Sequence, residues 1–140
     1  METRKVLVVD DEKNIVDIIK FNLKKEGYDV VTAADGQEAV DAFSRSAPFF
    51  FDVILMDLQM PRLDGCQAAQ AIRALDRPDA KSVFILALTA NTAAEDMGSS
   101  VTAGMDAHLS KPVPIPVICR TLARLTAKRK SDQAENETKL

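Results

Sequence analysis

The sequence predicts an α/β fold in which one doubly wound, parallel, five-stranded sheet is covered by helices on both faces. Short apolar runs rich in β-branched residues alternate five times with longer segments in which apolar residues recur at helical spacing. Such alternation is typical of parallel sheets. The apolar runs are nearly continuous, as in strands buried on both faces. A chain of 140 residues has the usual length of one domain.

The first strand and helix have the clearest patterns. The apolar run Lys5–Val9 predicts the first strand, and residues 28–33 predict the second. Between them, over residues 12–27, apolar residues recur at helical spacing, and Gly27 supplies the stop. The recurring residues are Ile15, Ile18, Ile19 and Leu23.

The middle of the chain predicts two further helices around the third strand. Residues 35–47 form one helix, the strand covers 52–56, and a shorter helix covers 65–75. The run Phe49–Phe51 is expected to pack at the entrance of the third strand, where at most one ring is exposed. The inward residues of the two helices are Ala39, Val40, Phe43, Ala69, Ile72 and Leu75.

The last third completes the pattern. The fourth and fifth strands are predicted over residues 82–88 and 106–110. The helix between them, over 92–104, contains two serines and a glycine, so we expect it to be the least stable. The last helix, over 116–130, turns Val117, Ile118, Leu122 and Leu125 inward.

The domain therefore extends over residues 1–130. Residues 131–140 show no periodicity and predict a disordered C-terminal tail.

The composition excludes several classes of function. A net charge of -3 is unfavourable for direct binding to nucleic acid, which depends on lysine and arginine. A single histidine excludes a His-rich metal site, and the N-terminus is too weakly apolar for a signal peptide or membrane span. Cys66 and Cys119 lie far apart and in no CxxC pattern, so we expect buried, reduced thiols and a cytoplasmic protein.

Polar side chains follow four of the five predicted strands. In a doubly wound sheet the carboxyl ends of the strands meet at one edge, where ligands bind. With the strand order 2-1-3-4-5, which flavodoxin also has, the first and third strands are neighbours. The residues gathered at this edge are Asp10 and Asp11 after the first strand, Asp57 after the third, Thr89 after the fourth and Lys111 after the fifth.

The three carboxylates predict a site for phosphoryl transfer. They repel one another, so either one is protonated with a raised pKa or a cation lies among them. Mg²⁺ prefers oxygen ligands and commonly uses one or two carboxylates. Asp57 would then be the nucleophile, while Lys111 offsets negative charge and Thr89 donates a hydrogen bond to the phosphoryl group.

Each of these residues also has a simpler explanation. Asp11 is an equally good N-cap for the first helix. Lys111 alone would be an ordinary solvated lysine. Asn91 or Thr92 is a better N-cap for the fourth helix than Thr89, with Glu95 completing a capping box. Core packing gives no reason, however, to place all five residues at one edge.

These residues resemble the response-regulator receiver domain of two-component signalling, and the resemblance extends from about Lys5 to Lys130. The last three of its motifs look most like receivers of hybrid histidine kinases. The motifs, in chain order, are "VLVVDDE", "DVILMDLQMPRLDG", "ILALTAN" and "GMDAHLSKPV".

The resemblance implies the flavodoxin-like receiver fold with five helices. It implies that Asp57 accepts a phosphoryl group from a phosphohistidine on a sensor histidine kinase or a histidine phosphotransfer protein. It further implies that Asp11 and Asp57 bind Mg²⁺ (or Mn²⁺) directly, with the backbone carbonyl of Gln59 as another ligand. Asp10 would act mainly through water.

The resemblance also implies roles for the residues around the phosphoryl group. Lys111 contacts it, and the Lys111–Pro112 peptide is cis. Gln59 and Asn91 tune the lifetime of the phosphoryl group. Gly65 follows the Met-Pro turn, where we expect it to supply backbone freedom.

His108 departs from the family pattern. Together with Thr89, a Tyr or Phe three residues before the lysine usually forms the switch, whereas this chain has a histidine. Either His108 serves as the switch residue, or it is a half-exposed strand residue without a switching role.

The predicted function is a phosphorylation-dependent signalling switch. It is not an enzyme with separate substrates, because it acts only on its own aspartate. Three alternatives remain: a binding module that no longer depends on phosphate, a flavodoxin-type cofactor binder and a phosphoaspartate-type hydrolase. The acidic loop "DDEKN" argues against the second alternative, since it would repel phosphate. We expect no membrane contact, and the downstream protein partner is not specified by the sequence.

Overall fold

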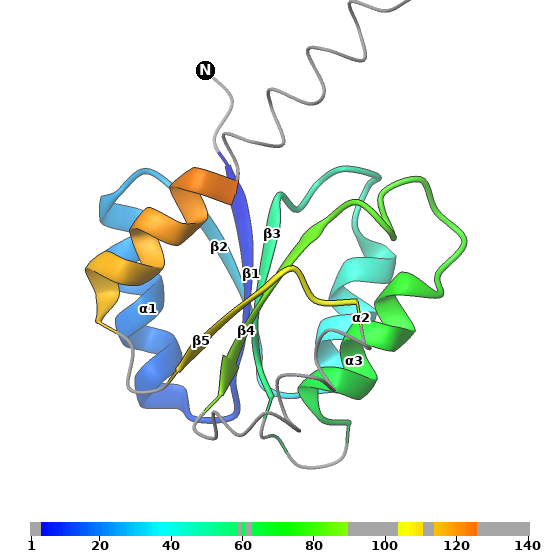
Figure 1. Cartoon of the computed structure of the whole chain (residues 1–140), viewed down its shortest axis with the longest axis horizontal. Helices are drawn as coiled ribbons and strands as arrows, with labels where there is room; N and C mark the ends of the chain where they lie inside the picture. The colour runs from blue at the N-terminus through cyan, green and yellow to red at the C-terminus, as the bar shows by residue number, and fades with distance from the viewer. Residues whose placement is uncertain (1–3, 59, 61–62, 90–103, 111–113, 126–140) are drawn as a thin grey trace, which may run out of the picture.

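The computed structural model describes residues 4–58, 60, 63–89, 104–110 and 114–125. Five parallel strands form one sheet in the order β2-β1-β3-β4-β5, which confirms the predicted α/β fold and strand order (Figure 1). The strands are β1 (Lys5–Val9), β2 (Asp29–Ala33), β3 (Val53–Asp57), β4 (Phe84–Thr89) and β5 (Ala107–Ser110). The helices are α1 (Lys13–Lys25), α2 (Gly36–Arg45), α3 (Gly65–Arg73) and a C-terminal helix over residues 115–125.

Two predicted segments lie largely outside the described residues. The fourth of the five predicted helices, over residues 92–104, falls there except for Gly104. The end of the last helix and the predicted disordered tail, over residues 126–140, fall there as well. Elsewhere the observed boundaries differ from the predicted ones by a few residues.

Helices cover the sheet on both faces (Figure 1). The two faces carry separate cores because successive strand residues point to opposite sides. Leu7 and Val9 of β1 pack on the side of α2 and α3, whereas Val6 and Val8 pack on the side of α1 and the C-terminal helix. The inner strands β1, β3 and β4 are thus buried on both faces, as their continuous apolar runs predicted. The edge strand β2 is not, since Asp29 and Val31 are exposed.

Helix α1 buries a narrower face than its sequence pattern indicated. Val16, Ile19 and Leu23 are its buried residues. Ile18, which the helical spacing grouped with them, is 54% exposed. The sheet covers only one stripe of the helix, and Ile18 points away from that stripe. The cysteines also differ from expectation, since Cys66 and Cys119 are partly rather than fully buried.

The helix ends are closed by local hydrogen bonds. Gly27 has a φ of 94°, and the N–H groups of Gly27 and Tyr28 donate to the carbonyls of Lys24 and Leu23, as in a Schellman motif. Gly27 is therefore the predicted stop. At the opposite edge of the molecule, the carboxylates of Asp35 and Asp64 cap α2 and α3. These caps fix where both helices begin, close to the carboxyl ends of the strands.

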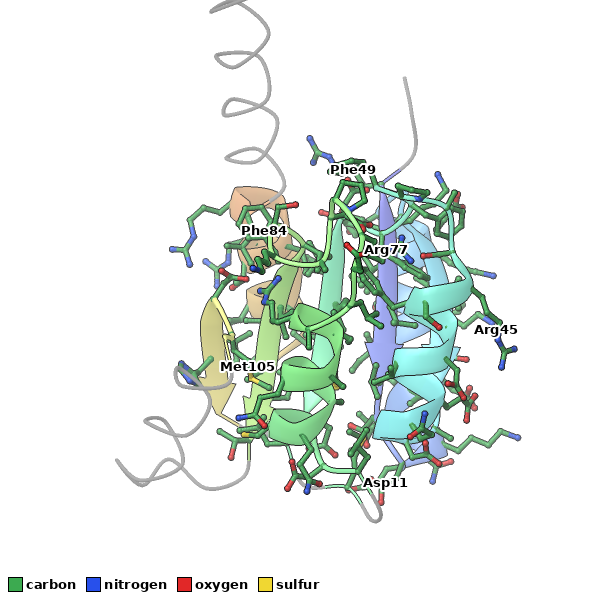
Figure 2. The ribbon with its side chains drawn as sticks, turned by 90° about the vertical axis from the view of Figure 1, so that its right-hand side faces the viewer. Asp11, Arg45, Phe49, Arg77, Phe84 and Met105 are labelled. Atoms are coloured by element: carbon green, nitrogen blue, oxygen red, sulfur yellow. The ribbon has the colours of Figure 1, made fainter. Side chains whose placement is uncertain are left out.

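A buried ion pair between Arg77 and Asp79 stabilises the end of the molecule at which the strands begin. Arg77 and Asp79 lie before β4, and the backbone N–H of Phe49 donates to Asp79 at 2.8 Å. Phe51 packs at the entrance of β3 as predicted, but both Phe49 and Phe50 are exposed. Figure 2 shows Phe49 and Arg77 at the end of the molecule opposite to Asp11.

Candidate functional site

The strand ends bring Asp10, Asp57 and Thr89 to one edge of the sheet. Asp57 is the last residue of β3, and Val9, just before Asp10, pairs in register with Met56. Thr89 ends β4, the strand on the other side of β3. The three side chains belong to residues that are only 2%, 1% and 1% exposed, respectively. The parallel register thus gathers buried polar residues on three neighbouring strands.

The turn after β1 fixes the orientation of Asp10. Its backbone N–H donates to the Ala33 carbonyl at 3.2 Å, and its Oδ1 accepts a hydrogen bond from the Glu12 N–H at 2.9 Å. Glu12 occupies the N-cap position of α1 without a side-chain cap. Asp11 is therefore not the N-cap, which removes the simpler of its two explanations. The positive end of the helix dipole also faces these acids.

Three carboxylates of this turn form a potential cation site. Oxygen atoms of Asp10, Asp11 and Glu12 lie within 4.8 Å of one another. Asp10 is buried, whereas Asp11 and Glu12 are exposed (Asp11 is labelled in Figure 2). Asp57 is not in this group, although its strand neighbours that of Asp10. An all-oxygen donor set suits a hard divalent ion such as Mg²⁺.

Glu12 is the one member of this group that the sequence did not single out. It follows Asp11 directly in the acidic run that ends the first strand, so the signal was present as a third consecutive acid. The helical pattern assigned Glu12 to α1 instead. Its N-cap position, outside the regular turns of the helix, is what places it beside the aspartates.

Gly65 has a different role from the one expected. It is the first residue of α3 rather than part of a free loop, and its φ is not positive. A Cβ atom at this position would lie 2.5 Å from the carbonyl oxygen of Asp57 and 2.8 Å from Cα of Leu58. Gly65 is therefore needed for the close approach of α3 to the end of β3, not for backbone freedom.

His108 lies on β5, in register with Ala87 of β4. It is partly buried on a strand at the edge of the sheet. This position leaves both of its predicted roles open. Several predicted site residues lie outside the described residues: Gln59, Asn91, Lys111 and Pro112, together with Thr92 and Glu95 of the alternative cap.

The fold and this edge define a doubly wound α/β protein with a group of acidic residues at the carboxyl ends of its strands. A family model of the response regulator receiver domain matches residues 6–123. The chain therefore belongs to the response regulator receiver domain family, and the resemblance seen in the sequence is confirmed. It is thus a receiver domain of two-component signalling.

Solved structures of receivers are similar to this chain along nearly its whole length. Chemotaxis protein CheY4 of Vibrio cholerae is 34% identical, with 89% of this chain and 99% of that chain covered and a TM-score of 0.81. The receiver domain of a sensor histidine kinase from Pseudomonas aeruginosa PAO1 is 35% identical, with 90% and 99% covered and a TM-score of 0.80. That structure has a magnesium ion coordinated in its active-site cleft.

A receiver domain of a signal transduction histidine kinase from Syntrophus aciditrophicus is also similar. It is 26% identical, with 90% of this chain and 92% of that chain covered and a TM-score of 0.80. Receivers that belong to histidine kinases are thus among the relatives, in agreement with the sequence motifs. Among the described helices, none is both long and apolar enough to cross a membrane.

Proposed function

We propose that Asp57 accepts a phosphoryl group from a phosphohistidine and that its phosphorylation changes the surface the domain offers to a downstream protein. The observation that supports this most strongly is the burial of Asp57 beside the strand that leads to Asp10, with Thr89 at the end of the next strand. A carboxylate buried among polar groups at a sheet edge is suited to act as a nucleophile. The donor would be a sensor histidine kinase or a histidine phosphotransfer protein.

The transfer itself exchanges one bond to phosphorus for another. A carboxylate oxygen of Asp57 forms a bond to phosphorus while the phosphorus–nitrogen bond of the phosphohistidine breaks, and the imidazole leaves. Thr89 donates a hydrogen bond to the phosphoryl group, and Lys111 offsets its charge. Water later hydrolyses the acyl phosphate, at a rate tuned by Gln59 and Asn91. The domain therefore acts only on its own aspartate.

A divalent cation is part of this proposal. Mg²⁺ or Mn²⁺ would be held by Asp11, Asp57 and the backbone carbonyl of Gln59. Asp10 would act through water, and the carboxylate of Glu12 lies close to those of Asp10 and Asp11. The oxygen donors of Asp10, Asp11 and Glu12 fit such an ion. When bound, the ion supplies positive charge that stabilises the negative oxygens of the phosphoryl group.

A small phosphodonor tests the assignment of Asp57. Acetyl phosphate with Mg²⁺ is expected to add one phosphoryl group to the protein, as measured by intact mass. Asp57→Asn should accept none, because the amide is not a nucleophile of this kind. Asp52→Asn, a change at the opposite end of β3, is the matched control and should be phosphorylated like the wild type. If the wild type takes up no phosphoryl group with several donors and both metals, the proposal is wrong.

Helix α1 offers a surface for the protein donor. Ile18 and Phe21 are 54% and 63% exposed, and the ammonium of Lys25 lies 5.3 Å from the centre of the Phe21 ring. A groove of about 350 Å³ between α1 and the C-terminal helix continues this surface. The helix starts directly after the acidic turn, so a protein that also covers the N-terminal part of α1 would reach that turn. The groove is lined by Asn22, Lys25, Glu26, Ile115, Pro116 and Cys119.

The charge of α1 indicates the chemistry of that donor. Lys13, Lys24 and Lys25 are exposed, and Lys20 is partly so, against the single acid Asp17 within the helix. An apolar centre surrounded by lysines fits a partner with an apolar patch and an acidic rim. The proposed donors act inside the cell, which supports a cytoplasmic location for the domain.

The change Phe21→Ala separates docking from chemistry. It should slow phosphoryl transfer from the protein donor about tenfold at limiting concentration, since exposed aromatic residues often dominate an interface. The rate with acetyl phosphate should stay unchanged, because that donor needs no docking surface. Phe49→Ala, at the other end of the molecule, is the control and should affect neither rate. An equal loss with both donors would contradict the docking role of α1.

A further inference from the structure

The described residues of the loop that follows Asp57 are held from several sides. In this loop, which joins β3 to α3, Leu58 and Met60 are each 8% exposed. Leu63 also packs against the core cluster on the side of α2 and α3. The Asp64 side chain accepts a hydrogen bond from the Gln67 N–H at 2.8 Å, and the Gln67 side chain accepts one from the Asp64 N–H at 3.0 Å. The described part of the loop is thus anchored in the core and at the start of α3.

Two glycines hold this loop by close backbone approach. Gly65 lies against Asp57 and Leu58, and its N–H donates to the Leu58 carbonyl at 3.2 Å. Gly36, the first residue of α2, lies against the other end of the loop. A Cβ atom at Gly36 would clash with the Leu63 carbonyl oxygen and lie 2.9 Å from the Leu63 carbonyl carbon.

A glycine is needed at position 36 because Leu63 lies so close, not because of the backbone conformation of Gly36. The positive-φ glycines among the described residues are Gly27 and Gly104, so the backbone of Gly36 could accommodate a side chain. The atoms in the way are backbone atoms of Leu63, which cannot move aside as the end of a flexible side chain would. An added methyl group at Gly36 must therefore displace either α2 or the loop.

We propose that Gly36 is a positioning residue for phosphoryl transfer. By letting α2 approach Leu63, it sets the position of the loop that begins immediately after the nucleophile Asp57. This inference rests on the proposed function of Asp57. Gly36 belongs to α2, which contributes none of the proposed chemical groups. Small displacements of a nucleophile slow such reactions strongly, because the reacting atoms must be aligned.

The variants Gly36→Ala and Gly27→Ala test this inference as a pair. Both add one methyl group to a glycine near a helix end. Gly27 has a φ of 94° and no atom within 4 Å of an added Cβ, so its change strains the backbone without pushing on another element. Gly27→Ala thus reports what a loss of stability alone does to the reaction.

The readouts are the rate of phosphorylation by acetyl phosphate and the rise in Tm on addition of Mg²⁺. Gly36→Ala should slow phosphorylation by on the order of tenfold or more and reduce the Mg²⁺-induced rise in Tm. Gly27→Ala should lower the Tm without Mg²⁺ but keep the wild-type rate and the wild-type response to Mg²⁺. Equal rates and equal Mg²⁺ responses in the two variants would overturn the inference.

A second pair of variants applies if Gly36→Ala does not fold. Leu63→Ala loosens the loop without a clash, and Leu75→Ala removes an equally partly buried leucine of the same core cluster outside the loop. Only Leu63→Ala should slow phosphorylation, and equal rates would overturn the inference. A wild-type protein that takes up no phosphoryl group would instead refute the proposed function of Asp57, so the two failures can be distinguished.

Discussion

At the scale of single residues, Asp79 stabilises the end of the molecule opposite to the acidic residues Asp10 and Asp11. Its side chain is fully buried and accepts hydrogen bonds from Nε of Arg77 at 2.6 Å and Nη2 at 3.0 Å. Such a two-pronged pair is among the stronger ionic contacts in proteins. The same carboxylate accepts the N–H of Phe49, whose φ of 64° is unusual for a residue with a large side chain. Asp79 thus stabilises a strained turn through a contact distant in sequence.

The pKa of Asp79 reflects these contacts. Burial alone would raise the pKa of this carboxyl, but hydrogen bonds from Arg77 and the Phe49 N–H bring it below the ordinary value. The folded state therefore binds the proton more weakly than the unfolded state, whose pKa is about 3.9. The stabilisation is present above that value and is lost as the pH falls through the folded-state pKa.

The change Asp79→Asn should therefore cost stability in a pH-dependent manner. At pH 7 we expect the free energy of unfolding to fall by about 3–5 kcal/mol, because Arg77 stays buried without its charge partner. The difference from the wild type should shrink as the pH falls below about 4, where Asp79 itself becomes protonated. Urea unfolding at several pH values measures both effects.

Asp76→Asn is the control for this change, since Asp76 is exposed on the same loop. It should alter the free energy of unfolding by less than about 0.5 kcal/mol. A cost for Asp79→Asn that is equal at pH 7 and pH 3 would contradict the role given to the charge.

At the scale of elements, Arg73 joins α3 to two other parts of the chain. From α3 it donates to the Gly104 carbonyl through Nε at 3.0 Å and Nη2 at 2.8 Å, just before β5. Its Nη1 donates to the carbonyls of Ala80 and Val83, before β4. Nη2 also pairs with Asp106, which accepts the N–H of Ile85. One side chain thus fixes α3 against the starts of two strands.

The pKa of Arg73 reflects its burial and its pairing with Asp106. Burial lowers the pKa of its guanidinium, while the neighbouring Asp106 acts in the opposite direction. An arginine nevertheless stays protonated at neutral pH. The side chain therefore contributes a permanent charge and a planar set of donors, and both are used here.

Replacing Arg73 by lysine should destabilise the fold even though the charge remains. We expect Arg73→Lys to lower the free energy of unfolding by about 2–3 kcal/mol. The three N–H donors of an ammonium cannot replace the five hydrogen bonds that Arg73 makes to four acceptors, so buried carbonyls are left unsatisfied. Arg45→Lys on α2 is the matched control, since its pairing with Asp41 is exposed and 3.9 Å long. That change should cost less than about 0.5 kcal/mol. Similar midpoints for both variants in urea would show that the contacts of Arg73 contribute little.

At the scale of the whole molecule, the sheet was predictable because its inner strands β1, β3 and β4 are apolar runs buried on both faces. The strand order then brought Asp10, Asp57 and Thr89 to one edge, as expected from the rule that parallel strands end together. These predictions depend on local pattern and chain direction alone. A single sequence carries such information directly.

The details that the sequence did not predict depend on contacts between distant elements. Ile18 fits the helical pattern of α1, but its exposure depends on how much of the helix surface packs against the sheet. The tight approach of Gly36 to Leu63 has no local signal, because an unstrained glycine at a helix start looks like many others. The same holds for Gly65, the first residue of α3, which packs closely against the end of β3. Packing between helix starts and loops decides such positions.

The order of the strands divides the site between two parts of the chain. Asp10 and Asp11 follow β1 and Asp57 ends β3, so the three acids lie in the part of the chain that forms β1, β2 and β3. Within that part, β1 pairs with both other strands. Thr89 and His108 belong to the later strands, which join the sheet only through β3. During synthesis all three acids therefore leave the ribosome before Thr89 and His108. Substitutions of Thr89 or His108 therefore alter the later half of the site and leave the acids themselves unchanged.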